Sequence, residues 1–204
     1  MSGASYTKDR RLNPGYVVDQ RLEIIRFIGA GGFASVYEAR QLNIDRICAI
    51  KVLKLTLEAD EEEMRTRFHR EAMAAAQIEH PNVVTVFDHG ILEDSQQPYI
   101  VMERLNGWDL ENELQEHGGL DPDRALRLFI PCLDALAMAH SRGVVHKDLK
   151  PGNLFITDPG ERRELLRILD FGIAHIGRSD SARLTGTGRV LGTPAYLAPE
   201  YIAE

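Results

Sequence analysis

HKDLKPGN, at residues 146–153, is the stretch that decides the fold of this chain, and Asp170-Phe171-Gly172 completes it. Asp148 can accept a proton from a hydroxyl group, and Lys150 can neutralise a phosphoryl group in transit. Asn153 and Asp170 carry the oxygen donors that magnesium prefers. Phosphoryl transfer needs this combination because its transition state is dispersed negative charge, which positioned cations stabilise. Two such motifs in this order, with a strand-like segment between them, predict a phosphoryl-transfer site.

The composition is typical of a soluble globular protein, with 44% hydrophobic and 27% charged residues among 204. This length allows one or two domains, and the net charge of −7 argues against general binding to nucleic acid. Cys48 and Cys132 lie in apolar stretches, so we expect them to be buried and reduced, and the seven histidines lack metal-ligand spacing. No apolar run approaches the ~20 residues of a membrane span. We therefore expect a cytoplasmic protein, or the cytoplasmic part of a larger membrane-anchored one.

Hydrophobic patterns divide the chain into a sheet-rich first part and a helical second part. The first part predicts strands at 21–28, 33–41, 46–53, 83–87 and 99–103, with one long helix at 60–78. The second part predicts helices at 109–116 and 122–142, and short strands at 154–157 and 167–169.

The long helix of the second part has clear start and stop signals. Asp121 is a suitable N-cap, Pro122 suits the first turn, and Gly143 suits the end. Pro131 is expected to kink the helix or shift its start. The stripe expected to face the core consists of Leu126, Phe129, Leu133, Leu136 and His140.

A glycine-rich segment, GAGGFASV at 29–36, lies between two predicted strands. Glycines allow backbone N–H groups to approach phosphates closely, although the pattern alone fits an ordinary hairpin equally well. Lys51 follows in an apolar strand, where a partly buried ammonium group needs a counter-charge. Glu71 is the preferred partner because it falls on the inward face of the first long helix, and the alternative is a local pair between Glu71 and Arg67.

Taken together and in order, these motifs resemble those of eukaryotic-type protein serine/threonine kinases, and bacterial members in particular. The resemblance runs from about Tyr16 to the C-terminus. It also rests on Cys48-Ala49-Ile50-Lys51, Arg70-Glu71-Ala72, His80-Pro81-Asn82, Val101-Met102-Glu103 and Ala198-Pro199-Glu200.

The resemblance implies an α+β, two-lobed protein-kinase-like fold. Residues 16–103 would form an antiparallel-sheet small lobe with one long helix, after a flexible lead-in at 1–15. Residues 104–107 would form the hinge, and residues 108–204 a mainly helical large lobe. We expect this lobe to be partial and the fold truncated, because the chain ends at Glu204.

The resemblance also implies ATP and Mg²⁺ as cofactors and a role for each matching position. Asp148 would be the catalytic base, Lys150 would contact the γ-phosphate, and Asn153 and Asp170 would ligate magnesium. The implied nucleotide-binding positions are Gly29, Gly31, Val36, Ala49, Lys51, Glu71, Met102, Glu103, Leu105, Asp109 and Phe155. Among these, Lys51 would contact the α- and β-phosphates, Glu103 and Leu105 would offer backbone groups to adenine, and Asp109 would meet the ribose.

The activation loop implied by the resemblance is 171–200. Thr185 and Thr187 occupy the positions of regulatory phosphosites, and Thr193 matches a threonine that contacts the catalytic Asp and Lys. The sequence departs from the family pattern at Lys147, where an arginine is usual, and at His175, where an arginine or lysine is frequent.

The expected partners are proteins with serine or threonine acceptors, and a second copy of the chain for autophosphorylation. Lys150-Pro151 is typical of the serine/threonine branch. A nucleotide-binding pseudokinase, an inactive fragment acting as a scaffold, and a small-molecule phosphotransferase are the alternatives. The complete set of site residues argues against the first, and Gly192-Thr193-Pro194 with the Ala-Pro-Glu motif favours a protein acceptor.

Overall fold

The computed structural model describes residues 11–31, 34–54, 61–158, 164–171 and 196, with positions 61–65, 67 and 71 described by their backbone alone. The chain forms two compact units. The first contains Met1–Ala76 and Thr85–Arg104, and the second contains Gln77–Val84 and Leu105–Glu204.

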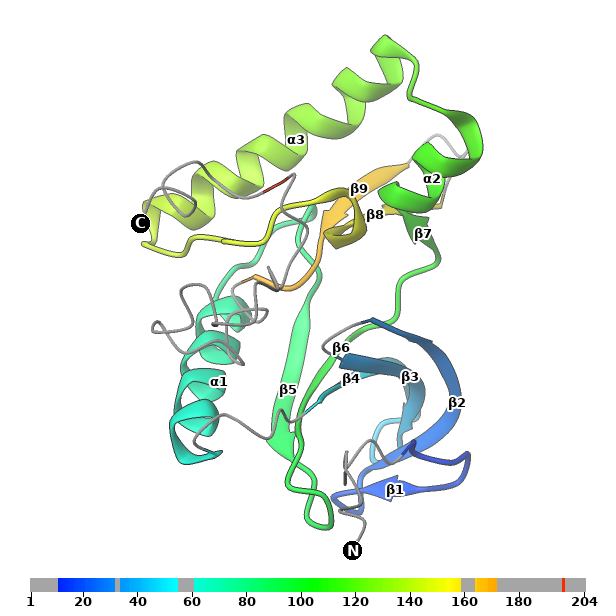
Figure 1. Cartoon of the computed structure of the whole chain (residues 1–204), viewed down its shortest axis with the longest axis vertical. Helices are drawn as coiled ribbons and strands as arrows, with labels where there is room; N and C mark the ends of the chain where they lie inside the picture. The colour runs from blue at the N-terminus through cyan, green and yellow to red at the C-terminus, as the bar shows by residue number, and fades with distance from the viewer. Residues whose placement is uncertain (1–10, 32–33, 55–60, 159–163, 172–195, 197–204) are drawn as a thin grey trace, which may run out of the picture. The chain divides into compact units, whose positions relative to one another are not determined.

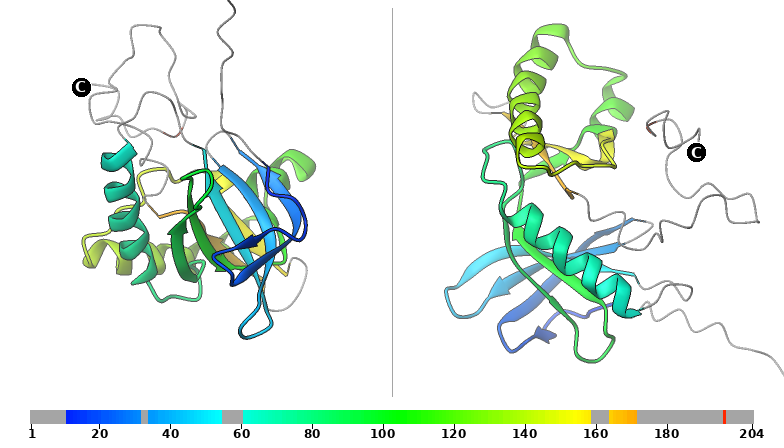
Figure 2. Two further views of the ribbon diagram at one scale, coloured as in Figure 1. Left: turned by 90° about the horizontal axis from the view of Figure 1, so that it is seen from below. Right: turned by 90° about the vertical axis from the view of Figure 1, so that its left-hand side faces the viewer.

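The first unit is built on a curved antiparallel sheet of six strands in the order β1-β2-β3-β4-β6-β5 (Figure 1). The strands are β1 (Val17–Val18), β2 (Leu22–Ala30), β3 (Ala34–Gln41), β4 (Arg46–Leu53), β5 (Val86–Ile91) and β6 (Pro98–Glu103). Helix α1 (Glu61–Ala76) lies beside β5, as Figure 2 shows, and buries Phe68 and Ala72.

Alternation along the central strands gives this sheet one face that forms the core. Tyr37 and Ala39 of β3 are buried on the same face as Cys48 and Ile50 of β4. Tyr99 and Val101 of β6 continue this face, and all six belong to one hydrophobic cluster. Because successive side chains of a strand point to opposite sides, the intervening residues of β3, β4 and β6 lie on the other face. Four of the expected nucleotide-binding positions, Val36, Ala49, Lys51 and Met102, occur there.

The second unit combines helices with a small sheet of strand order β7-β8-β9. Its elements are β7 (Gly107–Asp109), α2 (Leu110–His117), α3 (Pro122–Ser141), the 3-10 turn η1 (Pro151–Asn153), β8 (Leu154–Thr157) and β9 (Leu165–Ile168). Asp121 caps α3 as expected, because its side chain accepts from the backbone N–H groups of Asp123 and Arg124. Helix α3 packs against β9.

The expected core stripe of α3 is wrong. The buried residues are Leu128, Cys132, Ala135 and Ala139, whereas Leu126, Leu133 and His140 are exposed. The helix is apolar on more than one side, so its periodicity does not indicate which side packs. Small residues at positions 135 and 139 allow close approach to the sheet, and this decides the packed face. His140 is therefore a surface residue and not the core histidine that the pattern predicted.

The strand expected at 83–87 begins later, because β5 starts at Val86. Val83 forms a parallel bridge with Ile168, and the backbone N–H of Val84 donates to the carbonyl of Ile168 at 3.0 Å. These two buried, β-branched residues therefore belong to the second unit. Both cysteines are buried and unpaired, as expected, and burial raises the pKa of Cys132 to about 11. Among the described residues, no helix is both long and apolar enough to cross a membrane.

Candidate active site

His146 opens the loop that carries the predicted catalytic residues, and both of its ring nitrogens contact the backbone. Its Nε2 lies 2.7 Å from the carbonyl oxygen of Leu169, and the backbone N–H of Asp148 donates to its Nδ1 at 3.3 Å. Burial lowers the pKa of His146, which favours the neutral ring. The two contacts fit the tautomer that carries its proton on Nε2. Phe171 is buried and packs against His146, with the centroids of the two rings 5.0 Å apart.

Three predicted site residues meet at the carboxylate of Asp148. Lys150 places its ammonium nitrogen 2.8 Å from Oδ2 of Asp148. The side-chain amide of Asn153 donates to the same oxygen at 2.9 Å and to the backbone oxygen of Asp148 at 2.7 Å. Asp148 is therefore oriented from two sides while its carboxylate stays only half-buried. In this geometry the carboxylate can accept a hydrogen bond from a further donor.

The orientation of the Asn153 amide bears on metal binding. Its nitrogen makes both contacts to Asp148, so its oxygen Oδ1 is the group directed elsewhere, and the residue is only 8% exposed. The backbone N–H of Leu169 donates to the carbonyl of Asn153 at 2.9 Å, which brings the chain just before Asp170 alongside. An amide oxygen and a carboxylate on neighbouring segments fit the hard oxygen ligands that magnesium takes.

Two residues of this region adopt the left-handed backbone conformation without being glycine. Lys147 has φ 64° and Asp170 has φ 59°. Such conformations cost free energy and persist where the surrounding structure imposes them, often at functional sites. The contact between His146 and Asp148 spans Lys147, and the contacts of His146 with Leu169 and Phe171 lie on either side of Asp170, so they provide that constraint.

The first unit gathers four of its predicted nucleotide-binding residues on one face of the sheet, opposite the hydrophobic core. Val36 is paired with Lys51, and Ala49 with Met102. Lys51 and Ala49 are two residues apart in β4, so all four side chains share this face. Gly29 is paired with Val36 and belongs to the same patch.

Two further predicted positions of the first unit, Gly31 and Glu103, make backbone contacts within that unit. The N–H of Gly31 donates to the carbonyl of Ala34 at 2.9 Å, and the ammonium group of Lys54 donates to the carbonyl of Gly31 at 3.2 Å. The N–H of Glu103 donates to the carbonyl of Thr85 at 2.9 Å.

The second unit contains the other predicted nucleotide contacts, and two of them lie opposite each other on paired strands. Asp109 is paired with Phe155 across β7 and β8. Asp109 is also the N-cap of α2, because its carboxylate accepts from the backbone N–H of Asn112 at 2.8 Å and from the Asn112 side chain at 2.7 Å. Leu105 is buried.

Several predicted positions lie outside the described residues. These are Thr185, Thr187, Thr193 and His175, together with the side chain of Glu71. The pair between Lys51 and Glu71 and the regulatory phosphosites therefore stay predictions.

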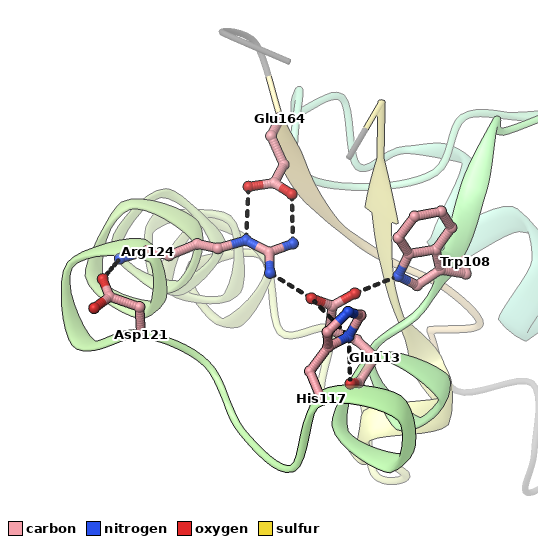
Figure 3. A network of polar contacts seen from close by, with 6 residues as sticks. All are labelled: Trp108, Glu113, His117, Asp121, Arg124 and Glu164. Carbon is pink, nitrogen blue, oxygen red and sulfur yellow. Dashed lines mark hydrogen bonds and ion pairs between the residues drawn. The ribbon is translucent and has the colours of Figure 1, made fainter. Parts of the chain in front are cut away.

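Sequence reasoning missed a polar cluster in the second unit, drawn in Figure 3. Glu113 of α2 accepts hydrogen bonds from the Trp108 indole and from Arg124 of α3. Arg124 also donates two hydrogen bonds to the Glu164 carboxylate, from Nε at 3.1 Å and from Nη2 at 2.6 Å. We call Trp108, Glu113, Arg124 and Glu164 the Glu113 network. Its only signal in the sequence is that Glu113 lies one turn from Leu110, on the apolar side of a short helix.

Comparison with known proteins agrees with this geometry. A family model described as "Protein kinase domain" matches residues 22–204. The serine/threonine-protein kinase pkn3 of Myxococcus xanthus is 40% identical over 188 residues, which cover 91% of this chain and 34% of pkn3. The serine/threonine-protein kinase PrkC of Bacillus subtilis is 39% identical over 186 residues, which cover 91% of this chain and 27% of PrkC.

The solved structures show the same fold. The kinase domain of Mycobacterium tuberculosis PknI superposes with a TM-score of 0.69 at 28% identity. The match covers 80% of this chain and 64% of the PknI chain. The fold is that of a protein kinase, and the chain belongs to the protein kinase domain family. The resemblance and the fold class drawn from the motifs are thus confirmed, and the chain spans about a third or less of the length of these curated relatives.

Proposed function

We propose that the protein transfers phosphate from ATP, with magnesium, to serine and threonine hydroxyl groups on proteins. One observation carries the proposal: the Asp148 carboxylate is held by Lys150 and Asn153 in a single hydrogen-bonded group. The names of the bacterial relatives support a serine or threonine acceptor. Positioning and charge are what phosphoryl transfer needs from a protein, and this group provides both.

Asp148 is the proposed catalytic base. It would orient the acceptor hydroxyl and take its proton as the oxygen–phosphorus bond forms and the bond to the leaving ADP breaks. Lys150 would keep its ammonium group beside the transferred phosphoryl group, whose negative charge it stabilises. His146 would take no proton in this scheme, because both its ring nitrogens are engaged with the backbone.

Asn153 and Asp170 are the proposed magnesium ligands. In the described parts of the chain no three His, Cys, Asp or Glu side chains gather into a metal site. That fits magnesium, which is usually held by one or two protein oxygens together with substrate phosphates and water. When bound, the ion would neutralise charge on the phosphates of ATP.

Residues of each unit are assigned a part in nucleotide binding. In the first unit, Lys51 would contact the α- and β-phosphates, and its neighbours Val36 and Ala49 would cover the adenine. In the second unit, Phe155 would contact the adenine, and its strand partner Asp109 would meet the ribose. The limits proposed for the lobes and hinge are those drawn from the sequence, at 16–103, 104–107 and 108–204.

The remaining proposals concern regulation and setting. We assign regulatory phosphorylation to Thr185 and Thr187, carried out by a second copy of the protein, and a contact with the catalytic residues to Thr193. The protein, or the part of it that contains this chain, would act in the cytoplasm.

The test uses the intact protein with labelled ATP and three acceptors: a generic basic protein, an aminoglycoside and choline. We expect label on the protein alone. Lys51→Met should reduce turnover far more than ATP affinity, because Lys51 positions the phosphates for transfer. A matched control is Arg40→Met, which removes an exposed cation from the neighbouring strand β3. Tight ATP binding without transfer to any acceptor would favour the pseudokinase alternative, and label on an aminoglycoside or choline would favour the small-molecule phosphotransferase.

A further inference from the structure

Helix α2 is held in place by very few side chains. Of its eight described residues, only Leu110 and Glu113 are buried. A helix of this length is not stable by itself in water, so tertiary contacts must hold it. The burial of Leu110 is apolar and not directional, whereas hydrogen bonds to Glu113 are directional. The rotation of α2 about its own axis therefore depends on Glu113.

The Glu113 network keeps this carboxylate ionised inside the protein. Glu113 is 2% exposed, and burial opposes its ionisation. The hydrogen bonds from Arg124 and Trp108 outweigh that effect, so the net result is a lowered pKa of Glu113. Hydrogen bonding to Glu164 and to Glu113 in turn raises the pKa of Arg124. A buried ion pair of this kind is seldom more stabilising than apolar residues of the same size. Its distinctive contribution here is that its directional hydrogen bonds orient helix α2.

The Glu113 network fixes the orientation of Asp109. Asp109 lies between Trp108 and Glu113 in the chain, and these two residues are joined by a hydrogen bond (Figure 3). The β7 residue before Asp109 and the α2 helix after it are thus joined through the carboxylate of Glu113. Asp109 is four residues before Glu113, about one helical turn, and its carboxylate caps the same helix.

Arg124 connects the Glu113 carboxylate to the rest of the second unit. It belongs to the first turn of α3, where its backbone N–H also donates to Asp121 at 3.2 Å. Its fork reaches Glu164, which directly precedes β9. The network therefore connects α2, α3 and the small sheet through one guanidinium group.

We propose that Glu113, held by Arg124, is a positioning residue that sets the Asp109 carboxylate for the ribose hydroxyl groups of ATP. This inference rests on the proposed function, which assigns Asp109 to the ribose. Neither Glu113 nor Arg124 touches the nucleotide in this account. Loss of the Glu113 charge releases the start of α2, and Asp109 then loses the direction that ribose binding requires.

The test compares ATP with dideoxy-ATP, which lacks both ribose hydroxyl groups, as substrates of the intact protein. The variants are Glu113→Gln, Asp109→Ala, their double mutant, and the control Glu116→Gln on the exposed side of the same helix. For the unmodified protein and the control, we expect KM for dideoxy-ATP to exceed that for ATP by about tenfold, the value of one charged hydrogen bond. Glu113→Gln should raise KM for ATP by about the same factor, leave KM for dideoxy-ATP unchanged and alter kcat little. The double mutant should be no worse than Asp109→Ala, because both changes remove one interaction.

A merely structural role for Glu113 would give a different result. In that case Glu113→Gln would raise KM for both nucleotides equally or lower kcat and the melting temperature while ATP keeps its advantage, and the inference would be overturned. If Glu113→Gln does not fold, Trp108→Phe removes one hydrogen bond from a half-exposed residue, and it must show the same selective loss for ATP. Absence of any ATP turnover in the unmodified protein would instead refute the proposed function. Turnover without preference for the ribose hydroxyl groups would refute the role of Asp109.

Discussion

Asn153 donates its side-chain amide twice to Asp148, once to the carboxylate and once to the backbone oxygen, at 2.9 and 2.7 Å. This relationship separates two roles within one loop. The nitrogen of Asn153 orients the proposed base, which leaves its oxygen as the group proposed to bind the metal. Asp148 and Asp170 should therefore be separable by experiment, although both are aspartates in the same unit.

Asp148→Asn should leave binding of magnesium-ATP nearly intact, because the amide keeps the size of the side chain and the metal position does not include Asp148. Asp170→Asn should weaken magnesium-dependent nucleotide binding, because one proposed ligand charge is lost. Calorimetric titration of each variant with ATP, with and without magnesium, measures this. The roles are wrongly assigned if Asp148→Asn abolishes binding while Asp170→Asn does not.

Gly107→Ala should destabilise the second unit. Gly107 has φ +134°, and a Cβ atom there would lie 2.0 Å from the carbonyl oxygen of Ile156 in the paired strand. We expect a loss of about 2 kcal/mol or more in the free energy of unfolding, measured by denaturant titration. Gly119→Ala is the matched control, because nothing lies within 4 Å of its added Cβ. Equal stability of the two variants would contradict the close approach of β7 and β8.

Stability should fall in mild acid through His89. Burial and, after it, the charge of His69 lower the pKa of His89, and the facing nitrogens of the two rings lie 2.8 Å apart. The unfolded chain, with a histidine pKa of about 6.5, then binds more protons than the folded one. Stability is fully present above that pKa and is lost as pH falls below it toward the folded value.

The measurement is thermal unfolding between about pH 5 and 8. His89→Gln should flatten the dependence, and His140→Gln, at an exposed site on α3, should not. A pH profile unchanged by His89→Gln would show that this pair does not contribute.

Features that depend on residues close together in the sequence could be predicted, whereas those that depend on distant residues could not. Asp148, Lys150 and Asn153 lie within six residues, so the motif alone predicted that they belong to one site, although it did not predict the contacts among their side chains. The packed face of α3 could not be derived, because apolar residues such as Leu126 and Leu128 lie on both sides of the helix. Arg124 and Glu164 are 40 residues apart, and pairing at that separation depends on the tertiary fold.

The exposed stripe on α3 should promote association. Leu126, Ile130 and Leu133 are 58, 56 and 58% exposed and follow helical spacing. Apolar surface of this kind favours contact between molecules. Light scattering of the isolated chain should show association that rises with concentration, and replacing all three residues by glutamine should reduce it. Ile44→Gln, at an exposed apolar residue of the first unit, is the control, and an equal effect of both changes would contradict a role for the stripe.

The most direct test of the account is the chemical identity of the labelled product and its dependence on Asp148. The intact protein is incubated with magnesium, γ-labelled ATP and a protein acceptor, and the labelled amino acids are identified after hydrolysis. The account predicts label on serine and threonine, and a rate reduced by a factor on the order of 100 to 10,000 in Asp148→Asn. Asp134→Asn, an exposed aspartate on α3, should match the unmodified protein. Label that persists at the same rate in Asp148→Asn, or that appears on neither serine nor threonine, would contradict it.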